Sequence, residues 1–476
     1  MALTIFVIYF GGLLIAGPLA ARLMKKKDSS DYILAGRQVP TWLVTGGIVA
    51  TLINSATLLG YGGSGYSLGI TAYFSSMGFV AILIWIGYYF IPKLRRTGIV
   101  TIPELFSRMF GWQHKVTSVL LVMARDMGVT AGAAIGMAVV LGSVFDISID
   151  LALVITVFVT LFFTVTGGMW AVMITDAIQS VILLVGTTIL IPLAIAYVGG
   201  WDTLLNAIPE THSDMWFAGG PQIVGWVLLG TLTTIAYQTL IQRGLSAESD
   251  KAAKDGFLYA GIITIIWYMV PFFIGVIALV IFPDITPDDA YLSVTRLFGT
   301  LGSLLFAVII VSSCISTLSS TVLTTASNIS NDIYKQWIHR DASEKSVVLV
   351  SRISVVVVAI TGALIARSLP YILELLLTGG RIMASSLSPV LLAIVFWKRA
   401  RRAYYSTISA MILGALTTIT LVVIGEQLGT DDGAVVFVWA VDPVLVGIPV
   451  TVLTLIIGTF IETRGWKDSK KATVNE

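Results

Sequence analysis

The residues between 312 and 325 are unusually rich in hydroxyl groups for an apolar chain. Nine of these fourteen residues are serine or threonine, and Ser313, Ser316, Ser319 and Ser320 recur at spacings that place them on one helix face. Hard cations prefer oxygen ligands, and hydroxyl groups supply oxygen without adding charge. The segment therefore predicts a cation site. The alternative is a serine-lined helix contact whose hydroxyls bond to carbonyls of the preceding turn.

A second polar segment runs from Ala50 to Gly65. Its middle carries Asn54, Ser55 and Thr57, and its second half is rich in glycine, which weakens a helix. An interrupted helix there exposes carbonyls that need partners inside the protein, and a cation or a polar solute would supply them. The competing interpretation is a close helix crossing, which small residues also permit.

Charged residues inside apolar stretches are the third signal, because burying charge in lipid is costly. Asp176 lies at a short junction between two apolar stretches, where it is either a solvated loop residue or an inward-pointing cation ligand. Arg125-Asp126 and Arg381 fall within apolar stretches. For these, a structural ion pair and a functional role are both open.

The elements that position these residues follow from composition. The 476-residue chain is 56% hydrophobic and 12% charged, with a mean hydropathy of +0.91, which excludes a water-soluble protein. Its net charge of +2 does not indicate a nucleic-acid binder, and one cysteine allows no internal disulfide. We predict an all-α polytopic membrane protein with thirteen spans: 2–22, 41–68, 73–95, 116–143, 149–168, 176–198, 222–243, 256–282, 298–331, 347–367, 371–397, 404–425 and 437–461.

The distribution of basic residues predicts the orientation of these spans. Of 29 lysines and arginines, all but Arg125, Arg296, Arg367 and Arg381 fall in alternate connections or in the C-terminal tail. Arg243 is counted with these connections. Because cytoplasmic loops carry the excess of basic residues, the N-terminus is expected outside and the C-terminus in the cytoplasm of a cell-membrane protein.

Several motifs resemble those of the sodium:solute symporter family. The strongest is Gly167 to Gln179; it is supported by Gln242-Arg243-Gly244-Leu245-Ser246-Ala247, by Leu387 to Ala400 and by Asp31 to Arg37. The resemblance covers about residues 1–465. It implies a single transmembrane transporter domain over 1–476, a carrier rather than an enzyme. Two inverted five-helix repeats, about 41–198 and 222–397, are then flanked by extra spans 2–22, 404–425 and 437–461.

The resemblance also implies sites for Na⁺. Residue by residue, the family's shared sodium site corresponds to carbonyls of Ala50, Ile53 and Ser313 and hydroxyls of Ser316 and Thr317. A second site, as in the sialic-acid members, corresponds to a set that shares one of those serines: Asp176, Ser316, Ser319 and Ser320. Two sodium ions per cycle are therefore expected.

The solute site is expected where broken helices meet. Its candidates come from several predicted spans: Asn54, Ser55, Thr57, Tyr73, Phe74, Ser75, Ser76, Arg125, Tyr237 and Gln238. For these residues a helix-packing contact remains the alternative. Val129 stands where sialic-acid members have a carboxylate-binding arginine, and Leu52 stands where proline members have an aspartate, so the solute is left open.

These observations predict a sodium-coupled symporter that imports a small polar organic solute by alternating access. Its expected partners are the solute, Na⁺ and the lipid bilayer, with no nucleic acid and no obligate protein partner. Two alternatives remain: a solute-binding membrane sensor, and a proton-coupled carrier that uses Asp176 as the relay.

Overall fold

The structure, a computed structural model, describes the chain except for residues 1, 27, 369–371, 428–441 and 465–476. It describes the backbone but not the side chains of residues 55, 56, 288, 372–377, 426 and 427. The regular elements of the described part are all helices, with no β-strand among the described residues, as the fold class predicts.

The helices of the first half are often interrupted. Their bounds are α1 Ala2–Ala21, α2 Ser29–Leu34, η1 Ala35–Arg37, α3 Thr41–Leu52, α4 Ser55–Leu68, η2 Gly69–Tyr73, α5 Phe74–Trp85, η3 Ile86–Phe90, α6 Ile91–Arg96, α7 Ile102–Phe110, α8 Trp112–Phe145, α9 Ile149–Thr188, α10 Leu190–Val198, α11 Trp201–Ala207 and α12 Glu210–Ser213.

The second half is built in the same way. Its helices are α13 Gly220–Ile235, α14 Gln238–Ser246, α15 Asp250–Trp267, α16 Met269–Ile281, η4 Pro287–Asp289, α17 Ala290–Arg296, α18 Gly299–Ser327, η5 Asn328–Ile338, α19 Glu344–Ser368, α20 Ile372–Ser385, α21 Leu387–Phe396, η6 Ala400–Arg402, α22 Tyr404–Gln427 and α23 Val444–Glu462.

Ten helical stretches of the described chain are long and apolar enough to cross a membrane, or eleven if the bent pair α13–α14 forms one span. Some of these stretches are long: Ile149–Val198 has 50 residues, whereas a crossing needs about 20. Because such a stretch has room for more than one crossing, the count of thirteen and the repeat arrangement stay predictions.

The predicted interruption of the second span lies between α3 and α4. Ile53 leaves the helical region with φ −88° and ψ 89°, and Asn54 is extended. Asn54 then caps α4: its side chain accepts from the Thr57 amide at 3.0 Å, and the Thr57 hydroxyl accepts from the Asn54 amide at 2.9 Å. This reciprocal capping satisfies donors at the new helix start and fixes the position of the break.

Two further bends shape the core. The chain turns by 47° between α13 and α14, at Ala236 and Tyr237. Within α9, Gly168 adopts φ 50°, and a Cβ there would lie 2.5 Å from the Tyr32 carbonyl oxygen. Only glycine fits this left-handed position, because it has no Cβ to clash.

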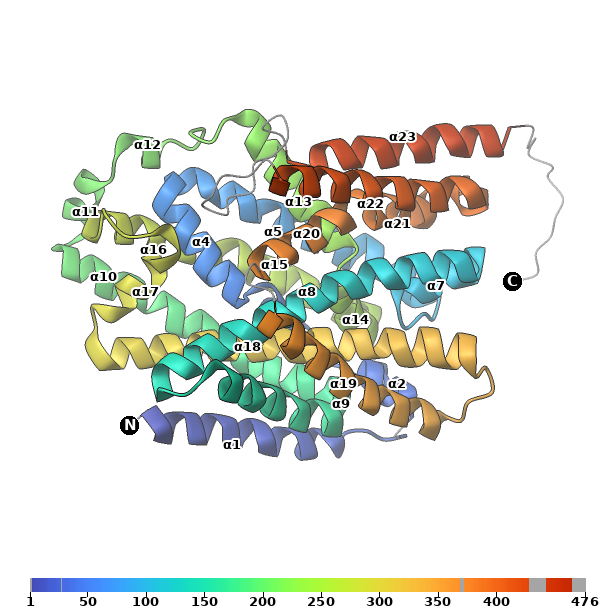
Figure 1. The fold of residues 1–476 in the computed structure, drawn as a ribbon, viewed down its shortest axis with the longest axis horizontal. Helices are drawn as coiled ribbons and strands as arrows, with labels where there is room; N and C mark the ends of the chain where they lie inside the picture. Colours follow the sequence, from blue (N-terminus) through green and yellow to red (C-terminus); the bar gives the residue numbers. More distant parts are fainter. Residues whose placement is uncertain (1, 27, 369–371, 428–441, 465–476) are drawn as a thin grey trace.

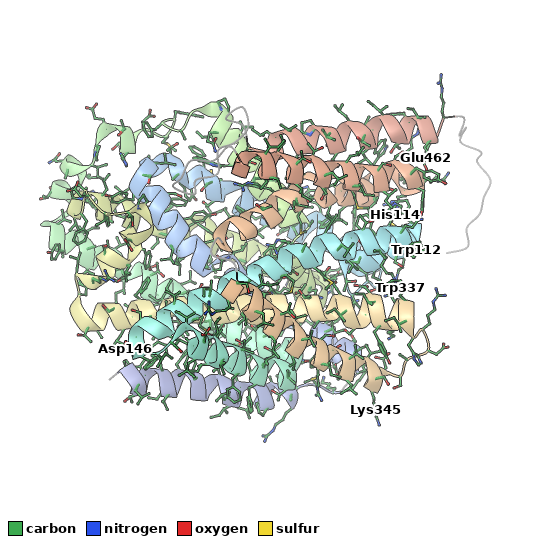
Figure 2. All side chains as sticks on the ribbon, viewed as in Figure 1. Trp112, His114, Asp146, Trp337, Lys345 and Glu462 are labelled. Carbon is green, nitrogen blue, oxygen red and sulfur yellow. The ribbon has the colours of Figure 1, made fainter. Side chains whose placement is uncertain are left out.

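Helix α18 is the buried centre of the bundle and crosses the molecule along its long axis (Figure 1). It packs against α3, α8, α9, α14 and α19, while α1 and the α22–α23 pair lie at opposite edges. Trp112, Trp337 and Lys345 gather at one end of the long axis, and Asp146 lies toward the other (Figure 2). The residues around α18 lie in the interior of the bundle.

Candidate functional site

The end of α3 faces the hydroxyl-rich stretch of α18. The Ser316 hydroxyl lies 3.3 Å from the Ala50 carbonyl oxygen and 2.9 Å from that of Ser313. The Thr317 hydroxyl lies 3.0 Å from the same Ser313 oxygen. Four of the five residues predicted for the first sodium site are therefore joined by direct contacts, and the fifth, Ile53, follows the end of α3.

We call these five residues (Ala50, Ile53, Ser313, Ser316 and Thr317) the serine site. Their oxygens are uncharged, and all five residues are buried. Because α3 stops at Leu52, the carbonyl of Ala50 lies in the last turn and lacks an intrahelical partner. Orphaned carbonyls beside hydroxyls form an oxygen-only donor set, which suits Na⁺.

The residues predicted for a second ion (Asp176, Ser316, Ser319 and Ser320) form what we call the aspartate site. Asp176 is fully buried within α9 and is not a solvated loop residue. Its Oδ2 atom lies 2.5 Å from Nη2 of Arg243 and 3.4 Å from the Ser320 hydroxyl. The Ser319 hydroxyl instead donates to the Ser316 carbonyl at 3.2 Å.

Arg243 is the residue that the sequence analysis missed here, because it was counted with the basic connections. It is 1% exposed, and its Nη2 atom also lies 2.7 Å from the Ser320 hydroxyl. The Gln-Arg-Gly-Leu-Ser-Ala motif was the available signal, since it places an arginine at the end of an apolar span.

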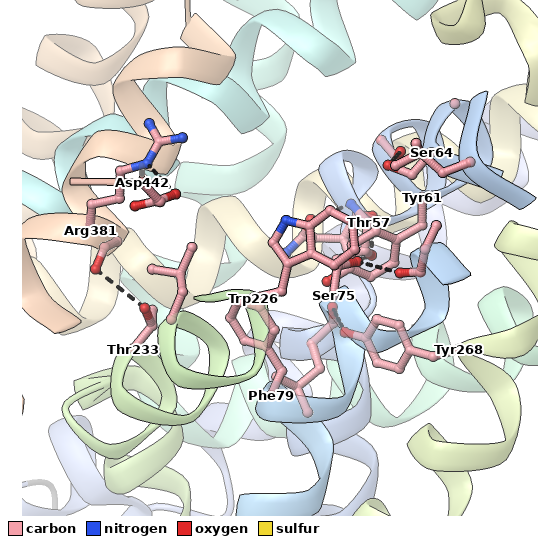
Figure 3. A pocket seen from close by; sticks show the side chains of 18 of the residues that line it. Thr57, Tyr61, Ser64, Ser75, Phe79, Trp226, Thr233, Tyr268, Arg381 and Asp442 are labelled. Atoms are coloured by element: carbon pink, nitrogen blue, oxygen red, sulfur yellow. Dashed lines mark hydrogen bonds and ion pairs between the residues drawn. The ribbon is translucent and has the colours of Figure 1, made fainter. Parts of the chain in front are cut away.

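A cavity of about 590 Å³ opens beside the interruption between α3 and α4 (Figure 3). We call it the solute cavity. Its wall combines aromatic rings with hydroxyl groups and charges, a mixture typical of sites for small organic molecules. Prominent among its residues are Thr57, Tyr61, Ser64, Ser75, Phe79, Trp226, Thr233, Tyr268, Arg381 and Asp442.

Half of the predicted solute residues line this cavity: Asn54, Thr57, Ser75, Arg125 and Tyr237. Others are engaged elsewhere. The Tyr73 hydroxyl donates to the Ile265 carbonyl at 2.6 Å, and Phe74 stacks on Trp216. Ser76 bonds to the preceding turn, and Gln238 bonds to Asn328. The Ser55 side chain lies outside the described residues.

Arg125 is both paired and turned toward the cavity. Its Nη1 atom lies 2.9 Å from Asp126 Oδ1, and its guanidinium covers the Tyr237 ring at 3.7 Å. Asp126 does not line the cavity. Arg125 packs closely on α20, where a Cβ at Gly379 would lie 3.0 Å from the Arg125 Cα. Arg125 therefore forms a structural ion pair and also lines the solute cavity.

Arg381 and Asp442 were not predicted as solute residues, yet both line the cavity. Their closest atoms, Nε and Oδ2, are 3.5 Å apart (Figure 3). Asp442 lies two residues before the start of α23, so a segment outside the expected repeats reaches the cavity wall. Only the three-dimensional packing of α20 against α23 brings these residues together.

A second cavity of about 540 Å³ reaches the serine site from another side. It runs between α4, α8, α17 and α18, and Asp289 and Arg296 are among its polar residues. Thr317 of the serine site lines this second cavity and not the solute cavity, whereas Asn54 lines both. The interruption after α3 thus separates two neighbouring spaces.

A buried polar seam continues from these sites toward the end of the molecule that carries Trp337. Gln238 of α14 donates to Asn328 at 2.6 Å and accepts from the Ile102 amide at 3.3 Å. The Thr101 hydroxyl donates to Asp332 at 2.8 Å. Helix α7 is thereby hydrogen-bonded to both α14 and η5.

Comparisons with known proteins agree with this geometry. The sequence model of the Sodium:solute symporter family matches residues 32–414. A sodium/glucose cotransporter of Vibrio parahaemolyticus is 27% identical, with 87% of this chain and 83% of the relative covered. A sodium/proline symporter of Haemophilus influenzae is also 27% identical, with 87% of each chain covered.

Solved structures share the fold. A substrate-bound, outward-open Na⁺-coupled sialic acid symporter superposes with a TM-score of 0.83 at 19% identity, covering 97% of this chain and 98% of that one. A nucleobase-cation-symport-1 family transporter gives 0.64 at 13% identity, with 93% and 96% covered. The family match spans most of the chain, and its relatives are transporters and not enzymes. The protein belongs to the sodium:solute symporter family, and it is a multi-pass membrane protein of the sodium-coupled symport class.

Proposed function

We propose that this protein imports a small polar organic solute together with Na⁺ by alternating access. The observation that carries the proposal is the contact between the Ser316 hydroxyl and the Ala50 carbonyl, at the end of an interrupted helix that also borders the solute cavity. The proposed ligands of the ion are the five residues of the serine site.

The ion and the solute are coupled because both bind next to the interruption between α3 and α4. A cation at the serine site holds the last turn of α3 against α18, while Asn54, just beyond it, lines the solute cavity. Tyr268 supports this arrangement, because its hydroxyl donates to the Leu52 carbonyl at 2.6 Å and its ring lines the same cavity. The bound ion therefore favours the backbone position that completes the cavity, and this difference in affinity couples ion and solute.

One ion supplies enough energy for accumulation. Moving one charge across 100 mV releases about 2.3 kcal/mol, which sustains a gradient of a neutral solute of about fiftyfold. The sodium concentration ratio adds to this.

Alternation needs a gate at each end. We assign the inner gate to the seam made by Thr101, Gln238, Asn328 and Asp332, which ties α7 to α14 and η5. With the N-terminus outside, this seam lies on the cytoplasmic side, in keeping with the basic residues there. Opening it would expose the serine site and the solute cavity to the cytoplasm.

Uptake into proteoliposomes tests the proposal. We expect an inward sodium gradient to drive accumulation of one member of a panel of sugars, amino acids and organic acids. A proton gradient alone should drive none. Proton-driven accumulation without sodium would instead favour the carrier that uses Asp176 as a relay, and binding without transport would favour the sensor.

The contacts of Asp176 weigh against that relay. Protonating Asp176 would leave Arg243, 1% exposed, without its partner at 2.5 Å. A buried charge whose partner is neutralised is strongly unfavourable.

A further inference from the structure

The aspartate site already contains a cation. Nη2 of Arg243 lies 2.5 Å from Asp176 Oδ2 and 2.7 Å from the Ser320 hydroxyl, two of the four groups expected to bind a second sodium ion. Both residues of the ion pair are within 1% of full burial. The family resemblance predicts Na⁺ where the structure places a guanidinium.

The surrounding helices are shaped to hold this guanidinium. Arg243 belongs to α14, and its Nη1 atom donates to the Thr239 carbonyl at 3.0 Å. Gly47 of α3 also lies against it, since a Cβ there would come within 3.0 Å of Arg243 Nε. Since Gly47 precedes Ala50 by three residues, and Ser320 follows Ser316 by four, the guanidinium lies about one helical turn from the serine site.

Charge balance sets what the aspartate site can bind. Arginine stays protonated in proteins, so Asp176 and Arg243 together are neutral. A sodium ion added to this pair would be a second positive charge in a buried place, next to a guanidinium that already uses Asp176 Oδ2 and Ser320. Uncompensated buried charge is costly, so the ion would have to displace the arginine.

We propose that Arg243 is a built-in substitute for the second sodium ion, so that this carrier couples to one Na⁺ per cycle. The inference rests on the proposed function and replaces the expectation of two ions. Among the described residues, Asp176 Oδ1 has no hydrogen-bond partner. That unused oxygen gives the proposal a consequence: without the arginine, the aspartate site regains the Asp176 carboxylate as a charged ligand and the Ser320 hydroxyl that Nη2 now contacts, and it can then admit an ion.

Direct binding of ²²Na⁺ to the purified protein tests this, together with the sodium dependence of its thermal unfolding. We expect one ion per wild-type chain and a Hill coefficient of about one. Arg243→Gln should bind two ions and raise the Hill coefficient toward two, whereas Arg243→Lys, which keeps the charge, should bind one. Arg367→Gln is the matched control, because it removes a surface arginine from its ion pair with Asp150.

Other outcomes are equally decisive. Two ions on the wild-type chain, or one ion on a folded Arg243→Gln chain, would overturn the proposal. If Arg243→Gln does not fold, the neutral double variant Asp176→Asn/Arg243→Gln replaces it; it should match the wild type at one ion, whereas a two-ion carrier would lose one. No sodium binding to the wild type at all would refute the proposed function itself, not only the stoichiometry.

Discussion

The serine site and the aspartate site are neighbours on α18 and share Ser316, yet they are built on opposite principles. The serine site gathers uncharged oxygens, which we propose to bind a cation from outside the protein. The aspartate site gathers a carboxylate and fills itself with a side chain from α14. Hydroxyl-rich sequence alone therefore does not distinguish an ion-binding turn from one occupied by the protein's own charge.

Substitutions at the two sites should therefore affect different properties of the protein. Loss of a ligand at the serine site should mainly change sodium affinity, because no buried charged group there loses its partner. Loss of a partner at the aspartate site should mainly change stability, because it leaves a buried charge alone. Four substitutions test this contrast.

The largest effect is expected for Asp176→Asn. Arg243 would then be buried without its counter-charge, at a cost of about 3–5 kcal/mol in the free energy of unfolding. Thermal unfolding in detergent should show this as a large drop in melting temperature. The double variant with Arg243→Gln should recover most of it, and no recovery would show that the two charges are not coupled.

Ser316→Ala should have the next largest effect, on ion binding. Losing one polar ligand costs about 1–3 kcal/mol, so the half-saturating sodium concentration should rise by a factor of about 5 to 150. Sodium titration of solute uptake measures this. Ser351→Ala is a suitable control, since Ser351 is also buried and bonds to its own helix at Val347. An unchanged sodium midpoint would remove Ser316 from the ion's ligands.

Gly47→Ala tests the packing of the built-in cation. The added Cβ would lie 3.0 Å from Arg243 Nε and from the Met173 sulfur, and such overpacking costs about 1–3 kcal/mol. We expect a lower melting temperature with a smaller shift in sodium midpoint than Ser316→Ala causes. Gly12→Ala is the control, because nothing lies within 4 Å of its Cβ position. Equal behaviour of the two variants would contradict the close fit around Arg243.

Asn54→Ala should have the smallest effect, and it should weaken the binding of both Na⁺ and the solute. It removes the cap of α4, worth about 0.5–2 kcal/mol, and so loosens the break that the ion and the solute share. Sodium and solute midpoints should both rise, whereas Asn54→Ser, which can still cap, should stay near the wild type. A change in only one midpoint would show that the break does not couple them.

Much of this architecture was predictable because its signals are local. The serine spacing on α18 predicts a shared face, and the polar, glycine-rich stretch after Ala50 predicts the interruption that the structure places at Ile53 and Asn54. The family motifs led to the same elements. Asp176 remained ambiguous, because a junction between apolar stretches does not reveal that the helix resumes directly after Gly168 and buries the carboxylate.

The missed residues are placed by packing between helices, which charge counting along the chain does not reveal. Arg243 follows an apolar stretch, so charge counting assigns it to a connection, although α14 turns it inward. Arg381 and Asp442 meet only because α20 packs against α23. Tyr73 and Gln238 have suitable side chains near the site, but their hydrogen bonds are made to Ile265 and Asn328. Sequence predicts which turns are polar, and packing decides what they face.

The two cavities that flank Asn54 bear on how an inhibitor would act. Thr317 borders only the space between α8 and α18, while Arg125, Trp226 and Tyr268 border only the other. A blocker that fills the aromatic side would leave the neighbouring opening clear, so sodium could still load behind it. Raising the sodium concentration should therefore strengthen the binding of such a compound. The ion and the compound would bind cooperatively and not competitively.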